Sequence, residues 1–288
     1  MDEYWPSYRQ KLLKLYTQKD QFFCFLQGEK PRRVPGKELE VFSHSWAVRY
    51  FASILLTVAL VLMAASVASA APRSLKTTGI PQASGSLNAE VIAPTVARKA
   101  PRRSARVAMK LSPSPQYGAG LTTLQVTRRV VRPDGSVWYR VRLNKRPAKS
   151  QGWVEGSRLR ISRNPLRIVV RTKARTLTVY RNNRRVMRTK IAVGKSSTPT
   201  PHGRFAVTEK IWLADKGSFL GPMVMPLTGY SETLDSFMGG DAQIGLHGTN
   251  NPSRIGKRST AGCAVMSNAA VLKLAKLIRP GTPVLIRS

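Results

Sequence analysis

The chain has 288 residues, enough for one sizeable core plus a smaller module. Its 48 Lys and Arg against 14 Asp and Glu give a formal net charge of +34, which predicts a polyanionic neighbour. Nucleic acid, anionic lipid and bacterial wall polymers all fit this charge. The three histidines and two cysteines are too few and too scattered for a zinc site, so neither a metal nor a cofactor is expected.

An apolar run covers residues 50–71 and contains no charged side chain. As a helix it would cross the roughly 30 Å hydrocarbon core of a bilayer. Two interpretations fit: an uncleaved single-pass anchor, or a signal peptide cleaved after the small residues Ala68-Ser69-Ala70. Residues 1–49 are then a cytoplasmic segment, or the true start lies downstream, for instance at Val48. Both versions predict an exported protein of the cell envelope.

Cysteine usage agrees with export. Cys24 precedes the apolar run, so Cys263 is alone on the exported side and has no intramolecular disulfide partner there. A solitary thiol in an oxidising compartment indicates a chemical task, and an inert buried cysteine is the alternative.

Residues 72–115 are rich in Pro, Ser, Ala and basic side chains and contain a single acid, Glu90. This composition predicts an extended, charged linker without a core of its own. The linker either adheres to an anionic wall layer or is a plain spacer.

Residues 116–163 predict a small β-barrel module. The runs "TTLQVTRRVV" and "VWYRVRL" alternate around a Pro133-Asp134-Gly135 turn, and "QGWVEGSRLRI" adds a strand pair. This stretch resembles the small bacterial barrels related to Src-homology modules. Trp138 and Trp153 either belong to the barrel's core or bind a ligand. Two tryptophans in so small a barrel are more often core residues.

Residues 165–288 predict a second, mostly β domain. Its strands include a hairpin turned at Asn182-Asn183. The segment "NAAVLKLAKLI", residues 268–278, has the domain's one helical spacing, with a cap at Ser267 or Asn268 and an end at Pro280-Gly281.

The candidate chemistry lies just before this helix, where a nearby helix N-terminus would favour the thiolate of Cys263. His247 is the candidate base, oriented by Asp241 or by a backbone carbonyl. The N–H groups of Gly262 and Cys263 are candidate oxyanion donors. From spacing alone, catalysis and coincidence remain equal alternatives.

The segment "IGLHGTNNPSRIGKRSTAGCAVMSN" resembles the catalytic signature of the L,D-transpeptidases with the YkuD-type β-sandwich fold, as do "TPTPHGRF" and "GTPVLIR" around it. The resemblance implies Cys263 as nucleophile, His247 as general acid and base, and Gly248 as the residue whose carbonyl orients His247. It places Gly262 beside the oxyanion hole. The implied reaction is acyl transfer through a thioester on the tetrapeptide stems of peptidoglycan.

The chain departs from the family signature around the cysteine. Thr260 stands at the usual serine and Ala261 at the usual basic or imidazole residue, and both are candidate substrate-binding positions. Val265 stands at the usual arginine and removes a planar donor fork, with Ala264 small beside it. These departures predict an altered rate or substrate preference.

The remaining alternatives are a carboxypeptidase-type hydrolase on the same fold and a catalytically weak wall-binding protein. Export and the lack of a recognition motif argue against nucleic acid as a partner, and the oligomeric state is left open. His202 is interpreted as a solvated loop histidine. Trp212, Phe219, Tyr230 and Phe237 either line the substrate groove or pack in the core.

Overall fold

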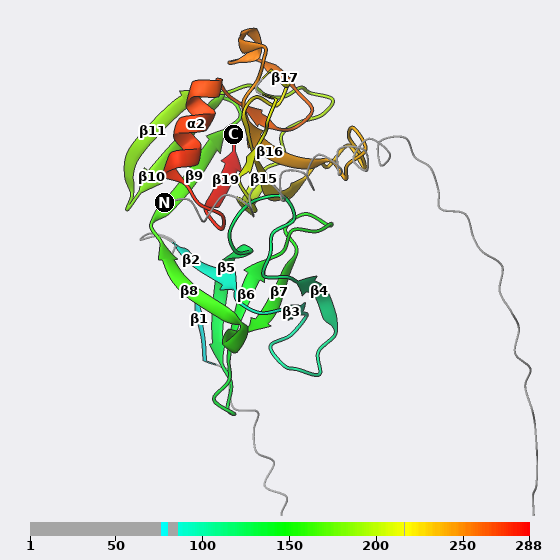
Figure 1. The fold of residues 1–288 in the computed structure, drawn as a ribbon, viewed down its shortest axis with the longest axis vertical. Coiled ribbons are helices and arrows are strands. Elements are labelled where there is room, and N and C mark those ends of the chain that lie inside the picture. Colours follow the sequence, from blue (N-terminus) through cyan, green and yellow to red (C-terminus); the bar gives the residue numbers. More distant parts are fainter. Residues whose placement is uncertain (1–75, 80–85, 216) are drawn as a thin grey trace, which may run out of the picture. The chain divides into compact units, whose positions relative to one another are not determined.

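The computed structural model describes residues 76–79, 86–215 and 217–288 (Figure 1). The expected cytoplasmic segment and the apolar run at residues 50–71 lie outside these residues. Within the described ranges, no helix is both long and apolar enough to span a bilayer.

The first half of the described chain forms an eight-stranded sheet with the order β4-β3-β7-β6-β5-β2-β8, and β1 pairs with β5 beside this path. A 3-10 turn, Gly156–Arg158, leads from β7 into β8. The strands are β1 (Lys76–Gly79), β2 (Ser86–Val91), β3 (Thr95–Arg98), β4 (Val107–Leu111), β5 (Thr123–Val131), β6 (Val137–Arg142), β7 (Gln151–Glu155) and β8 (Leu159–Asn164).

Residues 86–111 differ from the predicted linker, because they form β2, β3 and β4 of this sheet. Ala89, Val91 and Ala97 are fully buried and belong to the same core as Val126 and Val141. The module therefore begins about thirty residues before the predicted position 116, at or before Ser86. Composition averaged over residues 72–115 hid three short strands, in which small apolar residues such as Ala89 and Ala97 are buried.

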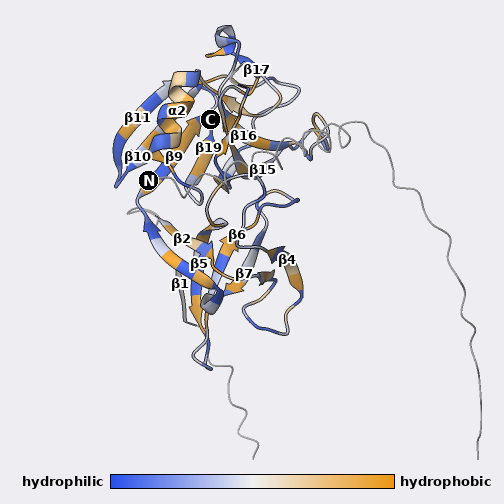
Figure 2. Cartoon of the chain, viewed as in Figure 1, coloured by the Kyte–Doolittle hydropathy of each residue, from blue (hydrophilic) through white to orange (hydrophobic). Residues whose placement is uncertain are grey.

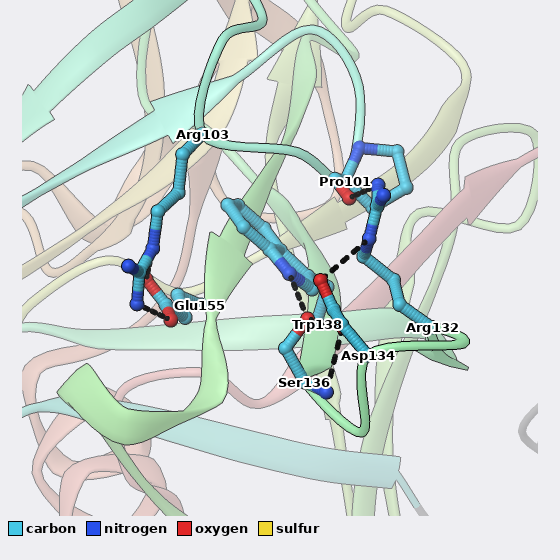
Figure 3. Close-up of polar contacts among 7 residues, drawn as sticks. All are labelled: Pro101, Arg103, Arg132, Asp134, Ser136, Trp138 and Glu155. Carbon is cyan, nitrogen blue, oxygen red and sulfur yellow. Dashed lines mark hydrogen bonds and ion pairs between the residues drawn. The ribbon is translucent and has the colours of Figure 1, made fainter.

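The predicted turn at Pro133-Asp134-Gly135 is present between β5 and β6 (Figure 3). Asp134 Oδ1 accepts hydrogen bonds from Ser136 N at 2.9 Å and Ser136 Oγ at 2.6 Å, and Trp138 Nε1 donates to the same hydroxyl at 3.2 Å. Trp138 is only 3% exposed. It is therefore a structural residue of the module, as the core interpretation predicted.

The second half contains two larger sheets, with orders β11-β10-β9-β19-β13 and β14-β15-β16-β18, and a small β12-β17 pair. The predicted hairpin turns at Asn182 and Asn183, both with positive φ. The elements are β9 (Leu166–Arg171), β10 (Thr176–Arg181), β11 (Arg184–Lys190), β12 (Val193–Gly194), β13 (Gly203–Ala206), β14 (Ile211–Trp212), β15 (Met223–Tyr230), β16 (Gln243–His247), a 3-10 turn Pro252–Arg254, β17 (Arg258–Thr260), β18 (Ala264–Val265), α2 (Asn268–Leu277) and β19 (Pro283–Arg287).

The prediction of a mostly β fold with a helix after Cys263 is confirmed, since α2 is the one α-helix of the described ranges. Val271 and Leu274 of α2 are fully buried in a single core with residues from both larger sheets. Figure 2 shows apolar residues along these strands, whereas β11 is largely hydrophilic.

Asparagines join the two halves of the described chain. Asn88 Nδ2 donates to the Pro280 carbonyl at 2.8 Å, and Asn164 Nδ2 donates to Thr282 Oγ1 at 3.2 Å. Gly281 lies against Asn88 with φ +79, and a Cβ on Gly281 would come within 2.6 Å of the Asn88 amide nitrogen. This junction requires glycine both for its backbone conformation and for space.

We expect Gly281→Ala to lower the free energy of unfolding by about 2–4 kcal/mol, through left-handed strain plus the contact with Asn88. Gly135→Ala is the matched control, because Gly135 has φ +78 with nothing within 4 Å. It should lose only about 1 kcal/mol. Urea unfolding of both variants measures the difference, and equal losses would show that Asn88 does not restrict the junction.

Candidate active site

His247 is the last residue of β16, which pairs antiparallel with β15 and parallel with β18. Its side chain is 6% exposed, and Nδ1 lies 2.7 Å from the carbonyl oxygen of Gly248. A carbonyl only accepts, so this contact requires the proton on Nδ1 and leaves Nε2 as the basic nitrogen. The expected pairing of Gly248 with His247 is thus present in the structure. Asp241 lies just before the first residue of β16, at the opposite end of the strand from His247.

Cys263 lies immediately before β18, where Leu246 pairs with Ala264 and His247 with Val265. Continuing this register places Cys263 beside Gly245, and the Gly245 backbone hydrogen-bonds to its thiol. Alternation along two parallel strands puts the side chains of Cys263 and His247 on the same face, two register positions apart, with the Leu246–Ala264 pair between them. The thiol is free and the residue is half-buried.

Burial controls the charge of both groups. It raises the pKa of the Cys263 thiol, and the hydrogen bond from Gly245 opposes this only in part. Burial also lowers the pKa of His247 to about 4; the positive charge of Arg254 acts in the same direction, and the carbonyls of Gly248 and Leu220 oppose it. The resting pair at neutral pH is therefore a neutral thiol and a neutral imidazole.

The direction of this pKa shift is opposite to the expectation that a nearby helix N-terminus favours the thiolate of Cys263. The helix begins at Asn268, and its N-cap Ser267 uses its side chain to accept from Ala270 N. Desolvation is the larger effect at this position.

Thr260 organises the turn before the cysteine. Its buried hydroxyl donates to the Cys263 carbonyl at 2.8 Å and accepts from the Gly262 N–H at 3.2 Å. The structure therefore gives one of the two expected oxyanion donors, the Gly262 N–H, a partner inside the turn. The Cys263 N–H has no partner among the described residues. Gly262 has φ +121, which favours glycine, and Ala261 is half-buried beside it.

Ala264 and Val265, two positions at which the chain differs from the family signature, are buried. Both side chains are 2% exposed, and the backbone of Val265 exchanges hydrogen bonds with Ala192 at 2.7 and 3.0 Å. An apolar residue therefore fills the position where the signature has arginine. The sheet gains apolar packing there, and the site loses a cationic donor.

Asn268 is a residue whose role the sequence reasoning missed, because it was considered only as a helix cap. Its Oδ1 accepts from the Thr249 backbone N–H at 2.9 Å. A Cβ on Gly221 or on Gly248 would come within 2.4 and 2.3 Å of this oxygen, so both positions leave room for it. Asn268 thus fastens the turn after His247 to the start of α2. The only signal in the sequence is a second capping-type residue beside Ser267.

Arg146, also missed, holds the β15–β16 loop. Its guanidinium donates to the carbonyls of Leu234 at 2.7 Å and Asp241 at 2.9 Å. It also lies 5.3 Å from the centroid of the Tyr230 ring. Nothing in the local pattern around Arg146 signals this role, because its partners are backbone carbonyls almost ninety residues away.

The aromatic candidates separate by exposure. Tyr230 is 2% exposed and donates to Asn144 Oδ1 at 3.0 Å, so it is a structural residue. Trp212, Phe219 and Phe237 are 65%, 41% and 45% exposed, which excludes core packing. His202 is exposed, with Nε2 2.9 Å from Thr172 Oγ1, as a loop histidine would be.

Comparison with known proteins identifies the second half of the chain. The model of the L,D-transpeptidase catalytic domain, YkuD, matches residues 165–286. YkuD of Bacillus licheniformis is 38% identical over 122 residues, which cover 42% of this chain and 66% of that protein. YqjB of Bacillus subtilis is 33% identical over 123 residues, covering 41% and 69% respectively.

Among solved structures, the NMR structure of the catalytic domain from the E. faecium L,D-transpeptidase is 25% identical and matches with a TM-score of 0.31. The match covers 42% of this chain and 95% of that one. The sequence matches at residues 165–286 enclose both His247 and Cys263. Through this domain the chain belongs to the YkuD family of L,D-transpeptidases.

Proposed function

We propose that this chain is a cysteine-dependent L,D-transpeptidase that acts on the tetrapeptide stems of peptidoglycan. The observation that supports this most is the placement of Cys263 beside β16, on the face of His247, with His247 Nδ1 held by the Gly248 carbonyl. A fixed imidazole with a basic Nε2 near a half-buried thiol is the arrangement that nucleophilic thiol catalysis needs.

The reaction begins with a neutral pair. Cys263 Sγ attacks the carbonyl carbon of the third stem residue while His247 Nε2 takes the thiol proton. The C–S bond forms and the carbonyl oxygen becomes an oxyanion, to which the unpartnered Cys263 N–H can donate. The C–N bond to the terminal D-alanine then breaks, and His247 returns the proton to the leaving amine. A thioester on Cys263 remains.

An amine from a second stem resolves the thioester. It attacks the thioester carbonyl, His247 accepts the amine proton, and the thiolate leaves and is reprotonated. Water in place of the amine gives the tripeptide acid, which is the carboxypeptidase alternative. Which nucleophile wins depends on how well the acceptor groove excludes water.

Incubation of the full chain in detergent with a disaccharide-tetrapeptide, followed by mass spectrometry, tests the proposal. A cross-linked dimer with release of D-alanine is the expected result. Tripeptide alone would establish the hydrolase, and binding to wall material without any turnover or thioester would establish a wall-binding protein.

Substitution of Asn268 tests whether this residue positions His247 for the proposed reaction. We expect Asn268→Ala to lower kcat/KM by about 10- to 100-fold, because the His247-Gly248-Thr249 turn loses its fastening and the base is misplaced. Asn268→Asp keeps an acceptor for Thr249 N–H and should recover most of the rate. Equal losses in both variants, or an unfolded Asn268→Ala protein by circular dichroism, would contradict a positioning role.

We further propose that anionic wall polymers contact the basic side of the catalytic domain. Residues 156–208, which include β9, β10 and β11, contain no Asp or Glu, and neither does α2. A groove of about 630 Å³ between β11 and α2 is lined by Arg185, Arg188 and Lys273 and by no acid. Such a surface attracts polyanions through charge alone.

Binding of the full chain to insoluble wall material should therefore fall steeply between about 50 and 200 mM salt, where screening becomes strong. We expect the double variant Arg185→Gln and Arg188→Gln to bind more weakly at every salt concentration in a co-sedimentation assay. The control is the double variant Arg103→Gln and Arg158→Gln. It removes the same amount of positive charge from the first half of the described chain. Equal weakening by the two pairs would show that the β11 surface is not the contact.

Export and attachment through residues 50–71 remain part of the proposal, as an anchor or as a cleaved signal. Sequencing the N-terminus of the mature protein from membrane and soluble fractions distinguishes these two forms.

A further inference from the structure

Arg254 ends the 3-10 turn that follows β16, and its side chain reaches the candidate active site. Arg254 Nη2 donates to the backbone carbonyl of Ser259, the residue directly before Thr260. The hydroxyl of Thr260 donates to the carbonyl of Cys263 and so organises the turn before the thiol. The guanidinium is therefore fastened at the edge of the turn that carries the candidate nucleophile.

Hydrogen bonds also hold the backbone around Arg254. Asn251 Oδ1 caps the 3-10 turn by accepting from Ser253 N at 3.2 Å and from Ser253 Oγ at 2.7 Å. The Asn251 N–H donates to Thr249 Oγ1 at 3.0 Å, and the Lys257 N–H donates to the Arg254 carbonyl at 3.1 Å. This preorganisation lowers the entropy cost of binding a ligand at the guanidinium.

The charge of Arg254 acts on the candidate base. Burial is the largest cause of the lowered pKa of His247, and the positive charge of Arg254 adds to it. The guanidinium therefore lies close enough to the imidazole for their charges to interact. In the proposed reaction His247 accepts a proton, and an uncompensated cation beside it opposes that step. An anion bound to Arg254 would remove this opposition.

The described part of the chain supplies no such anion. Arg254 takes part in none of the ion pairs between described residues. Residues 242–288, which include β16 to β19, contain no Asp or Glu. The Arg254 side chain is half-buried, and its hydrogen bond to Ser259 uses one N–H group of the guanidinium. The rest of the donor fork is open to a ligand.

The substrate of the proposed reaction carries an anion at a matching place. His247 Nε2 returns a proton to the amine nitrogen of the leaving D-alanine, so this nitrogen comes within hydrogen-bond distance of the imidazole. The carboxylate carbon of an amino acid lies only about 2.5 Å from its own amine nitrogen, two covalent bonds away. A cation close to His247 is therefore close to the terminal carboxylate of a tetrapeptide stem.

We propose that Arg254 binds the C-terminal carboxylate of the donor stem and so selects peptides with a single residue after the bond that Cys263 attacks. This inference rests on the proposed function and names the residue that sets its donor specificity. The planar guanidinium matches the two carboxylate oxygens. A stem with a fifth residue presents an uncharged peptide group at this place, and its carboxylate lies about 3.5 Å further along the chain.

Titration calorimetry on the full chain with Cys263→Ala, in detergent, measures this recognition without turnover. The probes are a disaccharide-tetrapeptide with a free D-alanine carboxylate and the same molecule with a C-terminal amide. We expect the acid to bind about tenfold or more tightly than the amide. Arg254→Gln in the same background should abolish this preference by weakening the acid alone. Arg258→Gln makes the same charge change at an exposed position of β17 and should preserve it.

A third probe distinguishes the terminal carboxylate from the side-chain carboxylate of a diaminopimelate in the third position. Lysine in that position removes the side-chain carboxylate and keeps the terminal one. We expect Arg254→Gln to weaken binding of the lysine stem about tenfold or more as well. An effect of Arg254→Gln that disappears with the lysine stem would assign the contact to the third residue and overturn the proposal.

Equal weakening of acid and amide by Arg254→Gln would show that Arg254 only holds the Ser259 carbonyl, and this too would overturn the proposal. The same conclusion would follow from equal effects of Arg254→Gln and Arg258→Gln, from equal binding of acid and amide, or from no saturable binding of either probe. Turnover by the unmodified chain is a separate readout. Its absence beside an intact preference for the acid would contradict the transpeptidase activity and leave the carboxylate recognition established.

Discussion

Replacing Cys263 by alanine should abolish transpeptidation, with a loss of about 10⁴-fold or more in kcat, because it removes the proposed nucleophile and the described residues contain no other cysteine to form the thioester. The covalent intermediate should disappear as well. Intact-mass spectrometry after mixing with substrate should show an acyl adduct on the unmodified chain and none on Cys263→Ala. The half-buried thiol is small, so the variant should fold normally.

Cys24→Ser is the matched control, because Cys24 is the other thiol of the chain and precedes the apolar run. It should keep both the adduct and the activity. Full activity in Cys263→Ala, or an adduct that follows Cys24, would contradict the mechanism directly.

Acid should destabilise this protein through His247. The pKa of His247 is lowered from 6.5 to about 4 in the folded state by burial, so the unfolded chain binds a proton there between these two values and the folded chain does not. Stability from this group is fully present above pH 6.5 and is lost as the pH falls toward 4. The shift corresponds to about 3 kcal/mol.

The variant His247→Gln removes the titrating group and should flatten this part of the pH dependence. Urea unfolding of both proteins at intervals from pH 7 to pH 4 measures it, and parallel curves would show that His247 is not the responsible group. In the same variant kcat/KM should fall by about 10²- to 10⁴-fold, because glutamine cannot take the thiol proton. Activity of the unmodified chain should not rise between pH 6 and 7, since a base with a pKa near 4 is already deprotonated there.

Local sequence patterns predicted much of the second half of the chain. The hairpin at Asn182-Asn183 and the helix from Asn268 depend on turn chemistry and on apolar spacing, which are local properties. Local patterns did not predict all strands of the first half. Strands β2 to β4 are short, and their small buried residues gain a core only when they pack with β5 to β8.

The candidate site likewise has one part that the sequence predicted and one part that it did not. The pattern around His247 and Cys263 selected the two candidate reacting groups, and Gly248, whose carbonyl lies 2.7 Å from the imidazole, is adjacent to His247 in the sequence. The predicted thiolate depended on treating the helix N-terminus as the nearest influence on Cys263. In the folded chain, burial of the thiol is the largest effect on its pKa and raises it.

By itself, the sequence determined the choice of Cys263 and His247 as candidate nucleophile and candidate base, the mostly β class and the basic character of the chain, because residue chemistry and short-range periodicity are local properties. Tertiary structure alone decided that the Gly262 N–H is engaged by Thr260 and that Asn268 fastens the turn after His247. Burial and hydrogen bonding between distant segments depend on which surfaces meet, and only folding brings those surfaces together.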